Sequence, residues 1–238
     1  MNKVAEALSR RAVVGHRGFP KRAPENTLAS FRSAMEAGVD IVEMDVQRSA
    51  DGVVFVLHDD NLERLAGVEV DVRRAPWALI SQYKIGGEPI PTLEDALRMI
   101  DGRTGVFVEI KHPEDSEYVK DVIKSTGATA WAAAISFYPE ALRPLRGLVP
   151  LGLIYSRPPG AVEVARREGF NFVLPHYRLA TERATAFAHR LGLMVIAWTI
   201  NDEDDMRTAW RRGVDAIASD DAELAVRVKR EFFDGVKL

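Results

Sequence analysis

The chain has 238 residues, of which 47% are hydrophobic and 28% charged, and its formal net charge at pH 7 is −3. This length is sufficient for one large hydrophobic core, and α/β barrels of such a size often form a single domain. The near-neutral charge argues against the clustered basic surface that nucleic-acid binding requires. The chain contains no cysteine, which excludes disulfides, thiolate catalysis and Cys-ligated metals.

The N-terminal segment 1–15 has no long apolar core before a small-residue cleavage site, so it does not resemble a signal peptide. Nowhere does the sequence contain a run of about 18 apolar residues, which a transmembrane helix would need. We therefore expect a cytoplasmic protein without a membrane span.

Strand and helix patterns alternate along the chain. Apolar runs typical of buried strands lie at 12–15, 40–46, 53–57, 105–110, 132–137, 151–155, 172–175, 193–200 and 214–219. Helical patterns, almost all of which end in Gly, lie between most of these runs at 26–38, 92–102, 117–127, 140–147, 160–169, 182–192 and 203–213. Such alternation with near-continuous apolar strands is typical of a parallel sheet.

The second and third runs have no helix between them. A parallel pair needs a crossover of a dozen or more residues, whereas Asp51-Gly52 is a strong hairpin signal. We therefore predict that 53–58 is an extra antiparallel strand and that a helix begins near Thr92. The predicted fold is an α/β protein, a (β/α)8 TIM barrel with this hairpin strand after the second barrel strand. It forms one domain over 1–238 with no separate cap domain.

The hairpin also predicts a register. If Asp51 and Gly52 are the two turn residues, Ala50 faces Val53. Asp45 then lies opposite His58 on the same face of the hairpin. The turn would thus carry His58 towards the carboxylate of Asp45.

The strand "DIVEMDV" contains two carboxylates, Glu43 and Asp45, which point the same way because side chains alternate along a strand. Unpaired buried charge is costly, so this face needs a cation or a salt-bridge partner. Side chains at the C-terminal ends of barrel strands converge on one site. Other polar or aromatic residues expected there are His16, Arg17, Glu109, Lys111, Trp198 and Asp220.

These residues lie in motifs that resemble the glycerophosphodiester phosphodiesterase family. The matching motifs, in order, are HRG, PENT, E-x-D-V, D-G, HD, "IPTLEDAL", "VEIK", "WTIND" and "GVDAIASD". The resemblance implies an α/β barrel, a divalent metal and hydrolysis of a glycerol-linked phosphodiester. Two departures, "SDDA" after the last strand and "LAGVEVDVRR" after the HD motif, leave the metal and acid–base residues intact.

The metal prediction rests on the carboxylates of Glu43, Asp45 and Glu109. Hard oxygen ligands favour Mg²⁺ or Ca²⁺, with Mn²⁺ possible, over zinc. We expect one such divalent cation, which would explain why the strand tolerates its two acids. The alternative is a surface salt-bridge pair at a strand end.

His16 and His58 are the candidate general acid and base, since histidine exchanges protons near neutral pH. The resemblance implies a two-step route in which the glycerol 2-hydroxyl attacks phosphorus and water then opens a cyclic phosphate. The sequence does not indicate which histidine acts first. The alternative for each is a structural core residue.

Arg17 and Lys111 are expected to bind the phosphate, or else to balance the acidic cluster. Trp198 is expected to pack on the glycerol carbons, with core packing as the alternative. Asn26 is predicted to be the N-cap of the first helix rather than a ligand. Glu25 beside it is an ambiguous candidate for a supporting role.

The predicted function is metal-dependent release of sn-glycerol 3-phosphate from small-molecule diesters such as glycerophosphocholine or glycerophosphoethanolamine. One alternative is lysophospholipase D activity, which uses the same catalytic set. Another is a barrel that binds phospho-ligands without turnover, although the intact motifs argue against it. Amidohydrolase barrels begin with H-x-H on the first strand, which is absent here. The leaving alcohol and the oligomeric state remain open.

Overall fold

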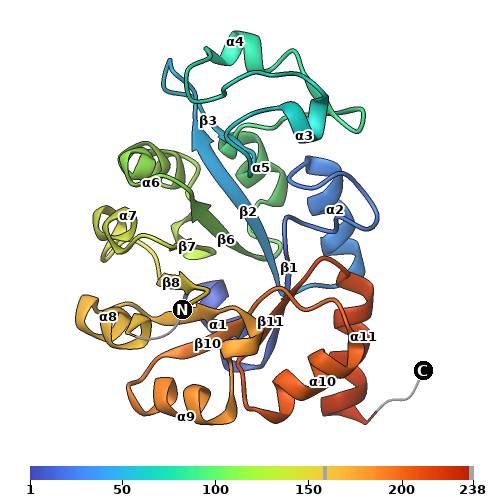
Figure 1. Cartoon of the computed structure of the whole chain (residues 1–238), viewed down its shortest axis with the longest axis vertical. Coiled ribbons are helices and arrows are strands. Elements are labelled where there is room, and N and C mark those ends of the chain that lie inside the picture. Colours follow the sequence, from blue (N-terminus) through green and yellow to red (C-terminus); the bar gives the residue numbers. More distant parts are fainter. Residues whose placement is uncertain (158–159, 236–238) are drawn as a thin grey trace.

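In the computed structural model, which describes residues 1–157 and 160–235, eight parallel strands close into a barrel (Figure 1). These are β1 (Ala12–Gly15), β2 (Ile41–Arg48), β6 (Gly105–Ile110), β7 (Ala132–Ser136), β8 (Leu151–Tyr155), β9 (Phe172–Pro175), β10 (Met194–Ala197) and β11 (Ala216–Ser219). Strand β1 pairs with both β11 and β2, which closes the ring. The predicted TIM barrel is therefore confirmed.

Helices surround the ring, and each predicted helical pattern overlaps one (Figure 1). They are α2 (Leu28–Ala37), α5 (Leu93–Ile100), α6 (Ser116–Ser125), α7 (Pro139–Leu142), α8 (Ala161–Glu168), α9 (Glu182–Arg190), α10 (Glu203–Arg211) and, unpredicted, α11 (Ala222–Asp234). The helix expected near Thr92 begins there, because the Thr92 hydroxyl accepts a hydrogen bond from the Asp95 amide. None of the helices in the described ranges combines the length and apolar character that crossing a bilayer requires.

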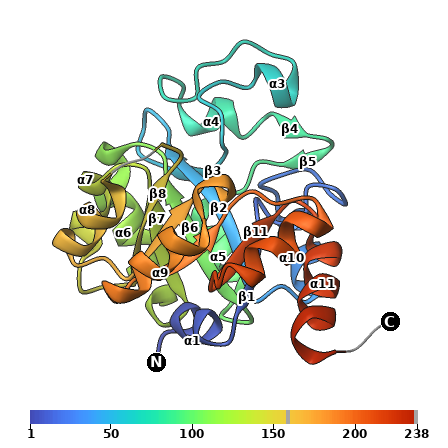
Figure 2. The same ribbon diagram turned by 60° about the horizontal axis from the view of Figure 1, so that its bottom comes forward.

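A further unpredicted helix, α1 (Lys3–Ser9), packs against the barrel interior. Its buried residues Val4 and Leu8 belong to the same apolar cluster as Phe107 and Phe172. The side-chain amide of Asn2 donates to the carbonyls of Thr129 and Ala132, which ties the helix start to the segment entering β7. Figure 2 shows α1 at the opposite end of the molecule from the loops that follow β3.

Strand β3 (Val54–Val56) runs antiparallel to β2 and lies outside the ring, as predicted, but the predicted register is wrong by one residue. Val46 opposes Val56, and the hairpin closes between Ser49 and Val53. The loop therefore contains three residues rather than two, and its last, Gly52, has a φ of +95°. A glycine in the left-handed region is what a three-residue hairpin loop requires.

The segment after β3 forms a small apolar cluster against that strand. It contains α3 (Glu63–Ala66), α4 (Trp77–Ile80) and the short pair β4 (Lys84–Ile85) and β5 (Glu88–Pro89). Its buried side chains pack on Phe55 and Leu57. In Figure 2 this segment lies at the top of the molecule, beyond the C-terminal end of β2.

Candidate active site

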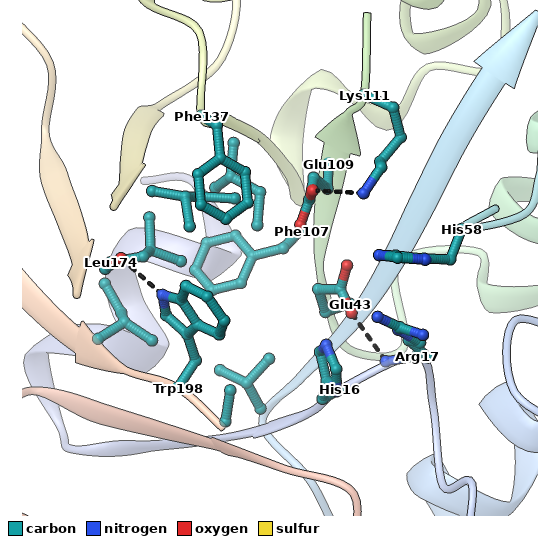
Figure 3. A pocket seen from close by; sticks show the side chains of 15 residues that line it. His16, Arg17, Glu43, His58, Phe107, Glu109, Lys111, Phe137, Leu174 and Trp198 are labelled. Carbon is teal, nitrogen blue, oxygen red and sulfur yellow. Dashed lines mark hydrogen bonds and ion pairs between the residues drawn. The ribbon is translucent and has the colours of Figure 1, made fainter. Parts of the chain in front are cut away.

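A cavity of about 220 Å³ lies at the C-terminal ends of the barrel strands. Seven of the eight predicted site residues line it: His16, Arg17, Glu43, His58, Glu109, Lys111 and Trp198. Figure 3 shows the polar side chains along one side and Trp198, Phe137 and Leu174 on the other. The eighth, Asp45, is buried beside this cavity and contacts its cationic residues.

Three carboxylates meet on one face of β2 and β6. Asp45 pairs in register with Glu109, and Glu43 precedes Asp45 by two residues on the same face. Each can offer one oxygen such that all three oxygens lie within 4.8 Å of one another. The exposed fraction of these residues does not exceed 9%. The sequence prediction that these acids converge is therefore met by their placement.

The three acids differ in their proton affinity. Burial, together with the charge of Asp45, raises the pKa of Glu43 to about 8 and that of Glu109 to about 7. Burial acts on Asp45 in the same direction, but Arg17 and Lys111 outweigh it and lower its pKa. Without further positive charge, the cluster therefore favours an ionised Asp45 and a protonated Glu43 near neutral pH.

The two carboxylate oxygens of Glu43 differ in their surroundings. Its Oε2 accepts a hydrogen bond of 2.7 Å from the Arg17 amide. Its Oε1 is buried and has no hydrogen-bond partner among the described residues. Buried polar atoms are nearly always satisfied, so this one fits a ligand position for a metal ion. Three carboxylates without thiolate or histidine neighbours in the cluster are a donor set for a hard cation.

His16 follows β1 and is held by the neighbouring strand of the ring. Its Nδ1 lies 2.7 Å from Oδ1 of Asp220, and its amide donates to the carbonyl of Ser219. Asn201 donates to the other oxygen of Asp220 at 2.7 Å. Although burial opposes protonation, the hydrogen bond to Asp220 and the charge of Glu43 raise the pKa of His16.

His58 lies beyond the end of β3, so the hairpin register alone does not place it. The side-chain amide of Gln47 lies 3.0, 3.1 and 2.8 Å from the carbonyls of Leu57, His58 and Asp59 and donates to them. These bonds turn the chain after β3, while Nδ1 of His58 pairs with Asp59 at 2.6 Å. In the observed register Leu57, rather than His58, bonds to Asp45, through its amide and the Asp45 carbonyl.

Sequence reasoning missed Gln47, although a signal was present. It continues the i, i+2 spacing of Glu43 and Asp45 on a strand of otherwise apolar character, and it is fully buried. A buried amide on that face needs hydrogen-bond partners, and the backbone of the returning chain supplies them.

A chain of ion pairs connects Arg17 to Asp59, the partner of His58. Glu25 accepts from Arg17 at 2.9 Å and from Arg64 at 2.7 Å. Arg64 also donates to Asp59 at 2.6 Å. Burial alone would raise the pKa of Asp59, but the hydrogen bonds from Arg64 and His58 lower it to about 2. Glu25 thus bridges Arg17 and Arg64, and nothing in the sequence indicated Arg64.

The N-cap prediction for Asn26 is wrong. Thr27 caps α2 by accepting from the Ser30 amide, while Asn26 lies one residue earlier with a φ of +59°. Its side chain donates to Oδ2 of Asp45 at 2.9 Å and accepts from the Asp45 amide at 3.2 Å. The tight turn before α2 therefore directs Asn26 to the buried acid rather than to the helix.

The remaining predicted residues lie on opposite walls. The ammonium of Lys111 lies 3.3 Å from Glu109 and 3.7 Å from Asp45, at the edge of the acidic cluster. Trp198 donates from its indole nitrogen to the Leu174 carbonyl at 2.7 Å, which fixes its ring against the cavity. Its ring also meets Phe137 edge to face, with centroids 5.8 Å apart.

Comparisons with known proteins agree with this geometry. Residues 16–224 match the model of the glycerophosphoryl diester phosphodiesterase family. A glycerophosphodiester phosphodiesterase from Caldanaerobacter subterraneus is 29% identical, over 92% of this chain and 98% of the relative. The solved glycerophosphodiester phosphodiesterase of Thermotoga maritima is 29% identical, with a TM-score of 0.82 over 92% of this chain and 98% of that one.

A phosphodiesterase from Oleispira antarctica, solved in complex with the product sn-glycerol-3-phosphate, is also similar. It is 27% identical with a TM-score of 0.84, and the match covers 94% of this chain and 98% of that one. Fold, site and family model all agree, so this chain belongs to the glycerophosphoryl diester phosphodiesterase family.

Proposed function

We propose that this protein hydrolyses glycerophosphodiesters, such as glycerophosphocholine and glycerophosphoethanolamine, to sn-glycerol 3-phosphate and an alcohol. The observation that carries the proposal is the meeting of three carboxylates, two histidines and two cationic side chains around one cavity. The product bound to the similar Oleispira antarctica enzyme supports this substrate class.

Glu43, Asp45 and Glu109 would hold one divalent cation, Mg²⁺ or Ca²⁺ with Mn²⁺ as a third candidate. The orphan oxygen of Glu43 and the raised pKa values of Glu43 and Glu109 support this fit. When bound, such an ion polarises the phosphoryl group and offsets the charge that develops on its oxygens.

The proton transfers fall to His16 and His58. One takes the proton of the glycerol 2-hydroxyl as that oxygen attacks phosphorus, and the other protonates the departing alcohol. Water then opens the cyclic phosphate with the two roles reversed. Each ring is oriented through Nδ1 by a carboxylate, Asp220 or Asp59, which leaves Nε2 to exchange the proton.

Arg17 and Lys111 would bind the phosphate oxygens, and Trp198 would pack on the glycerol carbons. The inner end of the cavity is closed by apolar side chains such as Phe107 and Ile196, which suits the carbon skeleton of a glycerol unit. We also propose that 1–238 acts as one catalytic domain, with the segment after β3 as part of the mouth.

The test measures sn-glycerol 3-phosphate released from glycerophosphocholine by the purified protein with added Mg²⁺ or Ca²⁺. Release should stop after EDTA treatment and return when the cation is restored. A parallel assay with lysophosphatidylcholine tests the acylated alternative. No release under any condition, or a preference for lysophosphatidylcholine, would contradict the proposal.

A further inference from the structure

Next to the catalytic cavity lies a second hollow of about 470 Å³, here called the outer groove. Its lining includes His58, Asp60, Glu109, Lys111, Phe137 and Tyr138. Four of these, His58, Glu109, Lys111 and Phe137, also line the catalytic cavity. The two hollows therefore meet at the residues proposed to bind phosphate and transfer protons.

A glycerophosphodiester has two arms, the glycerol and the leaving alcohol, one on each side of the phosphate. The two hollows differ in depth and lining, and this difference assigns one arm to each. The catalytic cavity ends inside the barrel against apolar side chains such as Phe107 and Ile196. The outer groove lies at the mouth, where the chain after β3 faces the chain after β6 and β7. If phosphate lies at the shared residues, glycerol fits the inner cavity and the other arm extends into the groove.

The chemistry of the groove favours a positive charge on that arm. The Asp60 side chain is 62% exposed, and its partner is the ring of His112 at 2.9 Å, rather than a lysine or arginine. Tyr138 is 47% exposed and Phe137 is 39% exposed, so both offer aromatic surface to a ligand. A carboxylate combined with aromatic faces is a common recognition pattern for ammonium groups.

The lysine and arginine side chains near the groove already form ion pairs with carboxylates. The Lys111 ammonium faces Glu109 and Asp45, and Arg64 is taken up by Glu25 and Asp59. Asp59 is neutralised in turn by Arg64 and His58. Among the charged side chains that line the groove, the Asp60 carboxylate is therefore the most exposed, at 62%.

We propose that the outer groove is the subsite for the leaving alcohol and that it selects an alcohol bearing an ammonium group. Asp60 supplies the opposite charge, and Tyr138 and Phe137 supply aromatic contact. The inference rests on the proposed phosphodiesterase activity and adds the class of leaving group to it.

The test compares kcat/KM for glycerophosphocholine with that for glycerophosphoglycerol, whose leaving alcohol is uncharged. Asp60→Asn keeps the size of the side chain and removes its charge, and Tyr138→Leu replaces the aromatic face with a smaller apolar side chain. Each should lower kcat/KM for glycerophosphocholine by roughly two- to fivefold and the pair by about 5- to 20-fold. The value for glycerophosphoglycerol should change by less than about twofold.

Tyr118→Leu is the matched control, because Tyr118 is 44% exposed on α6 and does not line the groove. This variant should leave the ratio of the two kcat/KM values unchanged. If the groove variants lower both substrates equally, or neither, the subsite assignment is wrong although the activity stands. If the wild-type protein hydrolyses neither diester, the proposed function fails and the subsite with it.

Discussion

The two histidines of the site are held by different parts of the molecule. His16 belongs to the ring itself, since it follows β1 and pairs with Asp220, which follows the adjacent strand β11. His58 lies on a hairpin outside the ring and is fixed by Gln47 and by Asp59. The position of His16 thus follows from barrel closure, whereas that of His58 depends on an added segment and a single buried amide.

The largest effect on activity should come from replacing one of the acids that lie between the two histidines. Glu43→Gln removes a buried carboxylate next to His16 and the Arg17 amide, and activity should fall to background together with metal affinity. Calorimetric metal titration and circular dichroism would show whether a folded protein has lost its cation. Full turnover by wild-type protein stripped of metal would refute this role.

Replacing either histidine tests whether His16 and His58 act as one catalytic unit. His16→Ala and His58→Ala should each lower kcat by about 10²–10⁴-fold, the usual contribution of a general acid or base. The double variant should be little slower than the slower single variant, because groups that act in one step are not additive. A histidine whose replacement leaves kcat at the wild-type value has a structural role only.

The residues that position the two histidines, Gln47 and Asp220, offer a sharper comparison. Gln47→Leu frees the chain around His58, and Asp220→Asn weakens the hold on His16. Each should lower kcat by about 10- to 100-fold, since small misplacements of catalytic groups have effects of this order.

Double-variant cycles separate positioning from general destabilisation. Gln47→Leu should add little to His58→Ala, and Asp220→Asn should add little to His16→Ala. Gln47→Leu also leaves buried carbonyls without donors, so its free energy of unfolding should drop by about 1–3 kcal/mol. If Gln47→Leu lowers the activity of the His58→Ala variant as much as that of wild type, its effect is on stability alone.

The same contrast shows what the sequence could predict. Strand periodicity and the missing helix after β2 predicted the barrel and the extra strand, because both depend on local patterns. The meeting of Glu43, Asp45 and Glu109 followed from strand alternation and from the common end of parallel strands. The motifs also indicated His16 and His58.

The sequence predictions were wrong or incomplete where contacts between distant segments determine the structure. The hairpin signal Asp51-Gly52 does not distinguish a two-residue loop from a three-residue one, and this shifted the register by one. Asn26 has the residue type of an N-cap, but its contact with Asp45 joins segments 19 residues apart. Arg64 comes from a segment without periodicity, so no local pattern connects it to Glu25 and Asp59.

The acids between the two histidines should make stability depend on pH. In the metal-free protein the pKa values of Glu43 and Glu109, about 8 and about 7, exceed their value of 4.5 in the unfolded chain. The folded state then holds protons that the unfolded chain has released, so this contribution is full below pH 4.5. It is lost as pH rises through the folded values of 7 and 8.

Thermal unfolding of the metal-free protein should therefore show a lower Tm at pH 9 than at pH 6, by the equivalent of a few kcal/mol. Added Mg²⁺ or Ca²⁺ should reduce this fall, because a cation replaces the protons as the partner of the acids. In Glu43→Gln the fall should be smaller. A Tm that rises with pH in the metal-free protein would show that the acids are ionised without metal.

Two glycines, one near each histidine, extend the comparison to the backbone. Gly18 follows the His16-Arg17 pair with a φ of +87°, and an added Cβ would lie 2.7 Å from the backbone carbonyl carbon of Ser30. The Ser30 hydroxyl also donates to the Arg17 carbonyl and accepts from the Phe19 amide. Gly18→Ala should therefore destabilise the fold by several kcal/mol, because positive φ and a backbone clash act together.

Gly52 has a similar φ of +95° in the β2–β3 loop, but an added Cβ would meet only ordinary contact, 3.5 Å from the Tyr118 ring. Gly52→Ala should thus lower the free energy of unfolding by only about 1–2 kcal/mol, the backbone cost alone. Because Gln47 holds His58 beyond the strand, kcat should change by less than about threefold. Urea titration and steady-state kinetics measure the two effects. A large loss of kcat in Gly52→Ala would show that the loop, and not Gln47, sets the position of His58.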